Sequence, residues 1–184
     1  MPMSDLAANL KETTLECGGS VVLRGPRAAD APSFAKHANN RDVWMNLRDL
    51  MPHPYSVDDA YAWIGMVQHQ ECRTSFIIDV NGEAIGGIGL VPGTDIERCS
   101  AEVGYWLGET YWGRGIATAA LQRICRYAFE DLGLRRVFAT PILWNPGSFR
   151  VLEKAGFEKE GLMRNACIKD GNLMDMALYA RIRP

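Results

Sequence analysis

The stretch Tyr111-Trp112-Gly113-Arg114-Gly115-Ile116-Ala117-Thr118 is the most informative part of this chain. It is a glycine-rich turn that leads directly into an amphipathic helical pattern, and the strand-like run Ala101–Leu107 comes just before it. Because the first amides of a helix have no partner within the helix and carry partial positive charge, such a turn attracts anions. Glycines let a phosphate approach the backbone closely. The segment therefore predicts a site for a phosphorylated cofactor.

The patterns around this turn predict an α+β domain. A strand, helices and three antiparallel strands precede the turn, and a helix, a strand, a short helix and two closing strands follow it. One helix joins the run before the turn to the next strand, which favours a single parallel pair in a mostly antiparallel mixed sheet flanked by helices. The expected ranges are Ser20–Arg24, a helix from Asp30, Val43–Leu47, Ser56–Gln70, Ser75–Val80, Ala84–Leu90, Arg98–Leu107, a helix after the turn as far as Gly133, Arg136–Thr140, Asn145–Gly156, Phe157–Met163 and Leu173–Ile182.

Length and composition favour one domain. The chain has 184 residues, of which 47% are hydrophobic and 23% charged, as in an ordinary soluble domain. We place this domain at residues 20–184, after an N-terminal extension at residues 1–19. The net charge of −2 gives no electrostatic attraction to nucleic acid or to a membrane surface. No stretch has the length of a signal peptide or a membrane span, so we expect a cytoplasmic protein.

The five cysteines carry no signal for a metal or a disulfide framework. They are scattered, form no Cys-x-x-Cys pair and have no histidine nearby at metal-ligand spacing. We therefore expect reduced thiols and no metal.

Two common phosphate-binding motifs do not fit the glycine turn. A P-loop needs a lysine that this turn lacks. A dinucleotide fingerprint needs a third glycine, and Thr118 stands in its place. A lone Gly-x-Gly also fits a tight turn with no ligand. The turn chemistry alone therefore leaves the cofactor open.

Three stretches that occur in this order are specific enough to indicate a protein family. They are AEVGYWL at residues 101–107, YWGRGIATAAL at residues 111–121 and NPGSFRVLEKAGF at residues 145–157. Together they resemble the GNAT acetyltransferase superfamily, and within it the group of Rim-type ribosomal-protein N-terminal acetyltransferases. The resemblance runs from about Ser20 to Pro184. It implies a single GNAT-like domain whose parallel strands splay apart, with acetyl-CoA as cosubstrate.

The resemblance also implies which residues hold acetyl-CoA. The superfamily's pyrophosphate turn, Arg/Gln-x-x-Gly-x-Gly/Ala, falls on Trp112–Ala117, and Trp112 replaces the usual Arg or Gln. The strand before the turn would pair with the pantetheine arm, and Asn145 would both cap its helix and contact pantetheine. The implied cofactor-binding residues are Tyr105, Trp106, Leu107, Trp112, Gly113, Arg114, Gly115, Ile116, Ala117, Thr118 and Asn145.

Two residues are candidates for the chemistry of acetyl transfer. Glu102 is a carboxylate in an otherwise apolar run, and we expect it to take the proton of the amine, directly or through water. The alternative for Glu102 is an ion pair with a neighbouring-strand arginine such as Arg98. Ser148 matches the Asn-x-x-Ser of the Rim-type motif and would protonate the leaving thiolate. The alternative for Ser148 is local helix capping.

The expected function is therefore N-acetylation of a primary amine by direct attack in a ternary complex. The resemblance favours a protein N-terminal α-amine as acceptor, and a small-molecule amine is the alternative. A CoA-binding module without catalysis is a second alternative. Asp49, Asp58 and Asp59 in the early loops are compatible with a basic acceptor, and the sequence leaves homodimer formation open.

Overall fold

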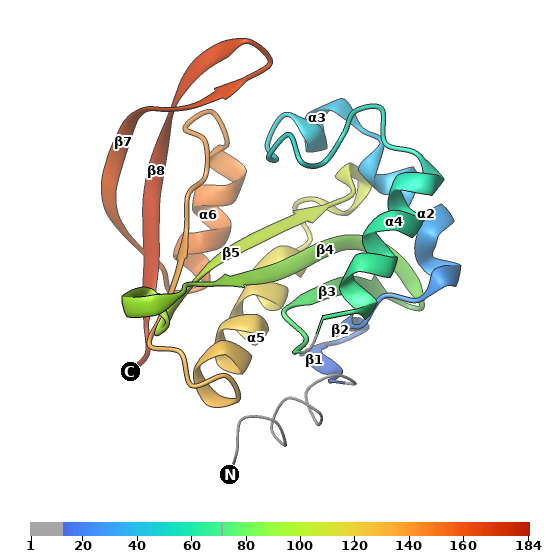
Figure 1. Ribbon diagram of the computed structural model, residues 1–184, viewed down its shortest axis with the longest axis horizontal. Coiled ribbons are helices and arrows are strands. Elements are labelled where there is room, and N and C mark those ends of the chain that lie inside the picture. Colours follow the sequence, from blue (N-terminus) through green and yellow to red (C-terminus); the bar gives the residue numbers. More distant parts are fainter. Residues whose placement is uncertain (1–12, 71) are drawn as a thin grey trace.

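The computed structural model describes residues 13–70 and 72–184. They form one eight-stranded mixed sheet in the order β1-β2-β3-β4-β5-β6-β8-β7, with helices on both faces (Figure 1). Only β5 and β6 pair in parallel among these strands, as the sequence predicts. The elements are β1 Leu15–Gly18, β2 Val21–Arg24, η1 Ala28–Asp30, α2 Ala31–Ala38, α3 Arg41–Trp44, α4 Val57–Gln68, β3 Ser75–Val80, β4 Glu83–Pro92, η2 Asp95–Glu97, β5 Ser100–Leu107, η3 Glu109–Tyr111, α5 Ile116–Glu130, β6 Arg136–Ala139, α6 Pro146–Lys154, β7 Glu158–Lys169 and β8 Asn172–Ile182.

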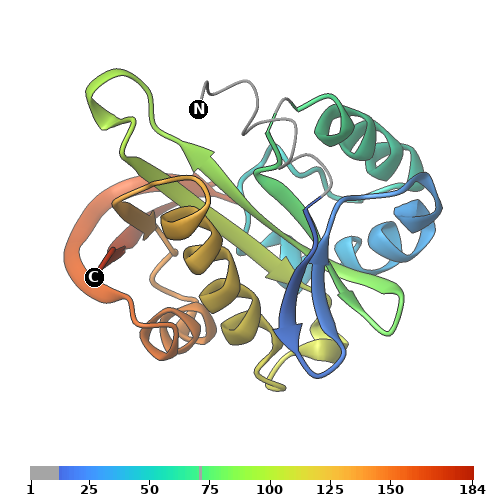
Figure 2. The same ribbon diagram turned by 90° about the horizontal axis from the view of Figure 1, so that it is seen from below.

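The sheet separates two hydrophobic cores. Along β3, Phe76 and Ile78 point to the core that α5 covers, whereas Ile77 points to the core beneath α2 and α4. This alternation follows from the two-residue repeat of a strand, and it makes β3 apolar on both faces. Figure 2 shows α5 across one face of the sheet, with α2 and α4 on the opposite side. The candidate active site draws residues from both faces.

The helix after the glycine turn, α5, carries the apolar stripe that its sequence predicts. Ala120, Leu121, Ile124, Cys125 and Ala128 are all fully buried against the sheet. This burial anchors the helix and so fixes where its N-terminus lies relative to β5. In the described part of the chain, no helix has the length and apolarity that crossing a bilayer requires.

The parallel pair of β5 and β6 is short, and the two strands separate near the centre of the sheet. β5 and β6 pair only from Ser100 to Glu102 on the β5 side, although β5 continues to Leu107. Val103–Leu107 remain paired with β4 on their other edge. Among the described strands, none pairs with the second edge of these residues. The two strands therefore splay apart, as the family resemblance implies.

Three elements show the clearest differences from the sequence-based ranges. β1 lies before the expected domain start at Ser20 and pairs with β2. α3 begins at Arg41 instead of Val43, because the Asn40 side chain accepts a hydrogen bond from Val43 N and caps it. β7 continues six residues past the expected end at Met163. It is an edge strand exposed on most of its length, so no alternation of apolar residues marks its second half.

Candidate active site

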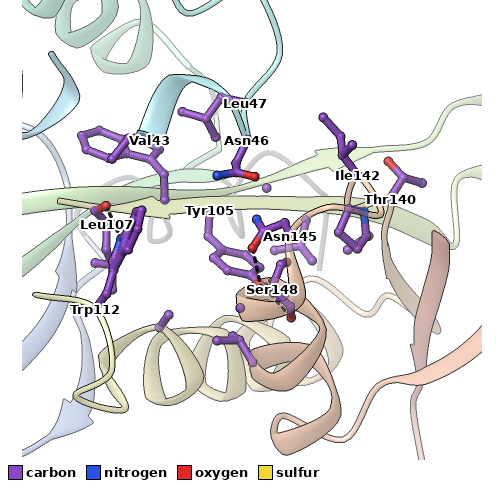
Figure 3. A pocket seen from close by; sticks show the side chains of 18 of the residues that line it. Val43, Asn46, Leu47, Tyr105, Leu107, Trp112, Thr140, Ile142, Asn145 and Ser148 are labelled. Atoms are coloured by element: carbon purple, nitrogen blue, oxygen red, sulfur yellow. Dashed lines mark hydrogen bonds between the residues drawn. The ribbon is translucent and has the colours of Figure 1, made fainter. Parts of the chain in front are cut away.

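A groove of about 1000 Å³ opens where β5 and β6 diverge (Figure 3). Its walls are β5, the glycine turn with the start of α5, the start of α6, the segment after α3, and the β7–β8 hairpin. The tertiary structure brings to this one groove every residue that the sequence predicts for the site: Glu102, Tyr105, Trp106, Leu107, Trp112, Gly113, Arg114, Gly115, Ile116, Ala117, Thr118, Asn145 and Ser148.

The glycine turn presents free amides to the groove. Gly113 and Gly115 have φ of 74° and 77°, in the left-handed region that glycine adopts without strain. The first bond of the α5 ladder runs from Ala119 N to Gly115 O at 3.0 Å, and no side chain caps this end. The amides of the first helical turn, from Ile116 onward, are therefore available to an anion. This arrangement fits the diphosphate of CoA.

The side chains of the turn act differently from the superfamily's usual Arg or Gln. The Trp112 indole Nε1 donates a hydrogen bond of 2.9 Å to Leu107 O, so this residue ties the turn to the end of β5. Figure 3 shows the indole folded back against the strand. The Arg114 guanidinium lies 5.3 Å above the centre of the Tyr111 ring. Trp112 thus shapes the backbone of the turn.

Ser148 stands at the start of α6 with its hydroxyl in the groove. Its amide donates a 3.0 Å hydrogen bond to Asn145 Oδ1, which is the helix cap. Its Oγ lies 2.8 Å from the hydroxyl oxygen of Tyr105 (Figure 3). The capping role that sequence reasoning offered as an alternative for the Ser148 side chain thus belongs to Asn145. The hydroxyl of Ser148 is left to pair with Tyr105.

Tyr105 keeps its proton over the physiological pH range. Burial raises the pKa of its phenol to about 12, and the hydrogen bond with Ser148 offsets this rise only in part. Tyr105 and Ser148 therefore form a neutral hydroxyl pair in which either group can donate.

Glu102 is held by two residues that the sequence did not single out. Arg48 Nη2 lies 2.6 Å from Oε1 and 2.7 Å from Oε2 of the carboxylate. Thr140, which follows β6, donates a 2.7 Å hydrogen bond from its Oγ1 to Oε1. Arg98, the arginine that we considered as a partner for Glu102, instead donates to Asp95 O. An ion pair of Glu102 therefore exists, but it reaches across the groove to the segment after α3.

Glu102 and Ser148 approach the groove from opposite faces of the sheet. Along β5, Glu102 shares a face with Trp106, whose ring packs edge-on against Phe34 at 4.8 Å on the α2 side. Tyr105 points to the other face and meets Ser148 there. The two candidate catalytic residues face a common space because the gap between β5 and β6 connects the two sides. A continuous β5–β6 ladder would separate them.

The segment after α3 is tied to the β7–β8 hairpin. Lys169 Nζ lies 2.6 Å from Asp49 Oδ1 and 3.6 Å from the centre of the Trp44 ring, and only 2% of Lys169 is exposed. Arg41 pairs with Asp170 at 2.7 Å. Figure 1 shows α3 facing the tip of this hairpin. Asp49, one of the acids that are compatible with a basic acceptor, is thus neutralised by Lys169.

Comparison with known proteins agrees with this architecture. The family model of the acetyltransferase (GNAT) domain matches residues 20–158. The chain is 34% identical over 170 residues to an uncharacterized N-acetyltransferase, p20, of Bacillus licheniformis, covering 89% of this chain and 93% of that protein. It is 36% identical over 117 residues to the ribosomal-protein-serine acetyltransferase of Escherichia coli, covering 64% of this chain and 65% of that protein.

Among solved structures, Mycobacterium smegmatis RimJ in complex with CoA-disulfide superposes with a TM-score of 0.79 at 27% identity, covering 92% of this chain and 87% of that one. Both the family model and the p20 relative span most of the chain. The chain therefore belongs to the GNAT family of acetyltransferases and is an acetyl-CoA-dependent N-acetyltransferase.

Proposed function

We propose that this enzyme acetylates a protein N-terminal α-amine, by direct attack of the amine in a ternary complex. The observation that carries this proposal is the placement of Glu102 and the Ser148–Tyr105 pair on two sides of one gap between β5 and β6. The name of the Escherichia coli relative, a ribosomal-protein-serine acetyltransferase, supports a protein acceptor. Acetyl-CoA, when bound, supplies the acetyl group as a thioester.

The residues that would hold the cosubstrate fit it along its length. The amides at the start of α5 receive the diphosphate. The free edge of Val103–Leu107 offers backbone groups to the amides of the pantetheine arm, as an added strand would. Asn145 caps α6 and so fixes the first helical turn, which carries Ser148. A backbone N–H on the same edge of β5 stabilises negative charge on the carbonyl oxygen during attack.

Each of the two proton transfers has a candidate group. An ammonium has no lone pair, so the acceptor must lose a proton, and Glu102 receives it directly or through water. Thr140 fixes the orientation of the Glu102 carboxylate through its hydrogen bond. On the other side of the gap, Ser148 gives a proton to the leaving thiolate. Tyr105, which is protonated before the transfer, can give its proton to Ser148 in turn, and solvent then returns a proton to the phenolate.

An acceptor screen tests this proposal. Release of free thiol from acetyl-CoA is measured with peptides that begin with Ser, Ala or Met, with the same peptides blocked at the N-terminus, and with small primary amines. Mass spectrometry then locates the acetyl group. We expect turnover with free N-termini and none with the blocked peptides. Turnover with small amines alone would contradict a protein acceptor.

The Glu102→Gln variant tests the role of the carboxylate. Glutamine keeps the shape and the Thr140 contact but cannot accept the proton at neutral pH. We expect kcat to fall by about 10²- to 10⁴-fold, the usual contribution of a general base, with CoA affinity retained. Calorimetric titration with CoA provides the control. A variant with full kcat excludes Glu102 as the base.

A further inference from the structure

Arg48 places a positively charged nitrogen on Glu102 from across the groove. Its Nη2 lies at 2.6 and 2.7 Å from the two carboxylate oxygens, which is nearly symmetric. A primary ammonium bound to a carboxylate takes the same position at similar distances. Both Arg48 and Glu102 line the groove. The position of Nη2 therefore marks where a cationic nitrogen can sit on this carboxylate.

The Arg48 side chain can leave this position easily. Its side chain is 69% exposed, and it belongs to the stretch between α3 and α4, which contains no strand. Among the hydrogen bonds of the described residues, those of Arg48 run only from Nη2, so its Nε and Nη1 groups are not anchored. An exposed ion pair of this kind favours its closed state by only about fivefold or less.

The Glu102 carboxylate, in contrast, keeps its orientation when Arg48 leaves. Thr140 holds Oε1 at 2.7 Å, and the Glu102 side chain is only 23% exposed. The nearby Lys169 cannot substitute for Arg48, because it is buried between Asp49 and the Trp44 ring. The position for a cationic nitrogen on Glu102 is thus preformed, and the Arg48 guanidinium that now fills it is weakly held.

We propose that Arg48 occupies the place of the acceptor nitrogen, and that an aliphatic primary amine binds as its ammonium form by displacing this guanidinium from Glu102. This inference rests on the proposed function, because it takes Glu102 as the group that receives the amine. Arg48 is then an internal competitor of the acceptor, and its side chain turns outward when the acceptor binds. The acceptor class that fits is a primary amine that is cationic before transfer.

Kinetics of an Arg48→Met variant test the competition. Methionine keeps an apolar stem and removes the charge. We expect the KM for the best peptide of the acceptor screen to fall two- to fivefold, in line with the strength of an exposed ion pair. The KM for acetyl-CoA should stay unchanged, and Arg48→Lys should stay close to the wild type, since it keeps a cation. An unchanged or raised KM for the peptide in Arg48→Met overturns the proposal.

Arg41→Met is the matched control. Arg41 is the first residue of α3, seven residues before Arg48, and forms an exposed ion pair of similar length, 2.7 Å to Asp170, but it does not line the groove. Its removal should leave the KM for the peptide as in the wild type. A decrease as large as that of Arg48→Met would show that loosening the segment is the cause, and would overturn the competition.

A binding measurement separates this proposal from the proposed function. Ethylammonium chloride is titrated into 15N-labelled wild type, Arg48→Met and Glu102→Gln, with sodium chloride as the ionic-strength control, and the amide signals of Glu102 and Thr140 are followed. We expect tighter binding in Arg48→Met and none in Glu102→Gln. If this holds while no amine is acetylated, the proposed function fails alone. If peptides are acetylated but Arg48→Met binds no tighter, the Arg48 proposal fails alone.

Discussion

At Ser148, the neighbouring Asn145 takes the capping role and leaves the serine hydroxyl free of it. Asn145 satisfies the Ser148 amide, so capping of α6 does not need the serine hydroxyl. The hydroxyl instead meets the protonated phenol of Tyr105 at 2.8 Å. Neither group is ionised near neutral pH, so a proton given to the thiolate leaves one negative charge on the pair, and a proton taken up from solvent restores it.

We predict that Ser148→Ala lowers kcat by about 10²-fold, at the lower end of general acid catalysis, and leaves CoA affinity almost unchanged. The helix should stay intact, since the cap uses the backbone amide of residue 148. Steady-state kinetics with the acceptor peptide, together with calorimetry for CoA, measure both effects. Tyr105→Phe is the companion variant. A larger loss of kcat in Tyr105→Phe than in Ser148→Ala would make the phenol the direct proton donor.

Among the secondary-structure elements, α5 contributes to the groove through its N-terminus. The helix is anchored by its buried stripe, and its first amides are left without partners by a glycine N-cap. Both features follow from one short stretch of sequence. The proposed anion site depends on backbone geometry, so substitutions at the cap test it better than substitutions of side chains.

We predict that Gly115→Glu weakens CoA binding by at least about a hundredfold, a loss of roughly 2.7 kcal/mol. The backbone φ of 77° disfavours any residue with a Cβ, and the added carboxylate repels the diphosphate. Gly133→Glu is the matched control, because Gly133 has a similar φ of 68° in open space beyond the other end of α5. Calorimetric titration with CoA compares the two. Equal affinities in both variants would place the diphosphate elsewhere.

At the scale of the whole molecule, a buried ion-pair cluster connects β2, β3 and the segment before α2. Arg24 on β2 donates to Asp79 on β3 at 2.7 Å and to both oxygens of Asp30, before α2, at 2.7 Å. Burial raises the pKa of Asp30, but the hydrogen bonds from Arg24 and from the Arg27 amide outweigh it, so the net shift is downward. This cluster holds α2 against the sheet and thereby supports the α2 face of the site.

We predict that Arg24→Met lowers the free energy of unfolding by about 3–5 kcal/mol at pH 7, because it leaves two buried carboxylates without their partner. The folded-state pKa of Asp30 lies below its unfolded value, so this stabilisation is present above about pH 4 and is lost as pH falls through the folded-state pKa. Urea unfolding between pH 7 and pH 3 measures it. A difference between variant and wild type that grows on acidification would contradict this sign.

Patterns within a few residues predicted most elements correctly. The Ser56–Asp59 capping box begins α4 where expected, and the apolar repeat of α5 is buried as predicted. The three motifs also placed the glycine turn, Asn145 and Ser148 in one site. These features are readable because hydrogen bonds to nearby backbone and the repeat of a helix depend on residues close in sequence.

The partners of Glu102 could be identified only from the tertiary structure. Arg48 lies 54 residues from Glu102 in the chain and Thr140 lies 38 residues away, so no local pattern links them. The same holds for Lys169 with Asp49, which are 120 residues apart. The second half of β7 was missed because an edge strand exposed on both faces imposes no apolar repeat. Local residues were thus enough to specify most of the elements, the glycine turn and the family. The surroundings of the candidate base depend on which distant segments meet across the β5–β6 gap, and only the folded chain sets that.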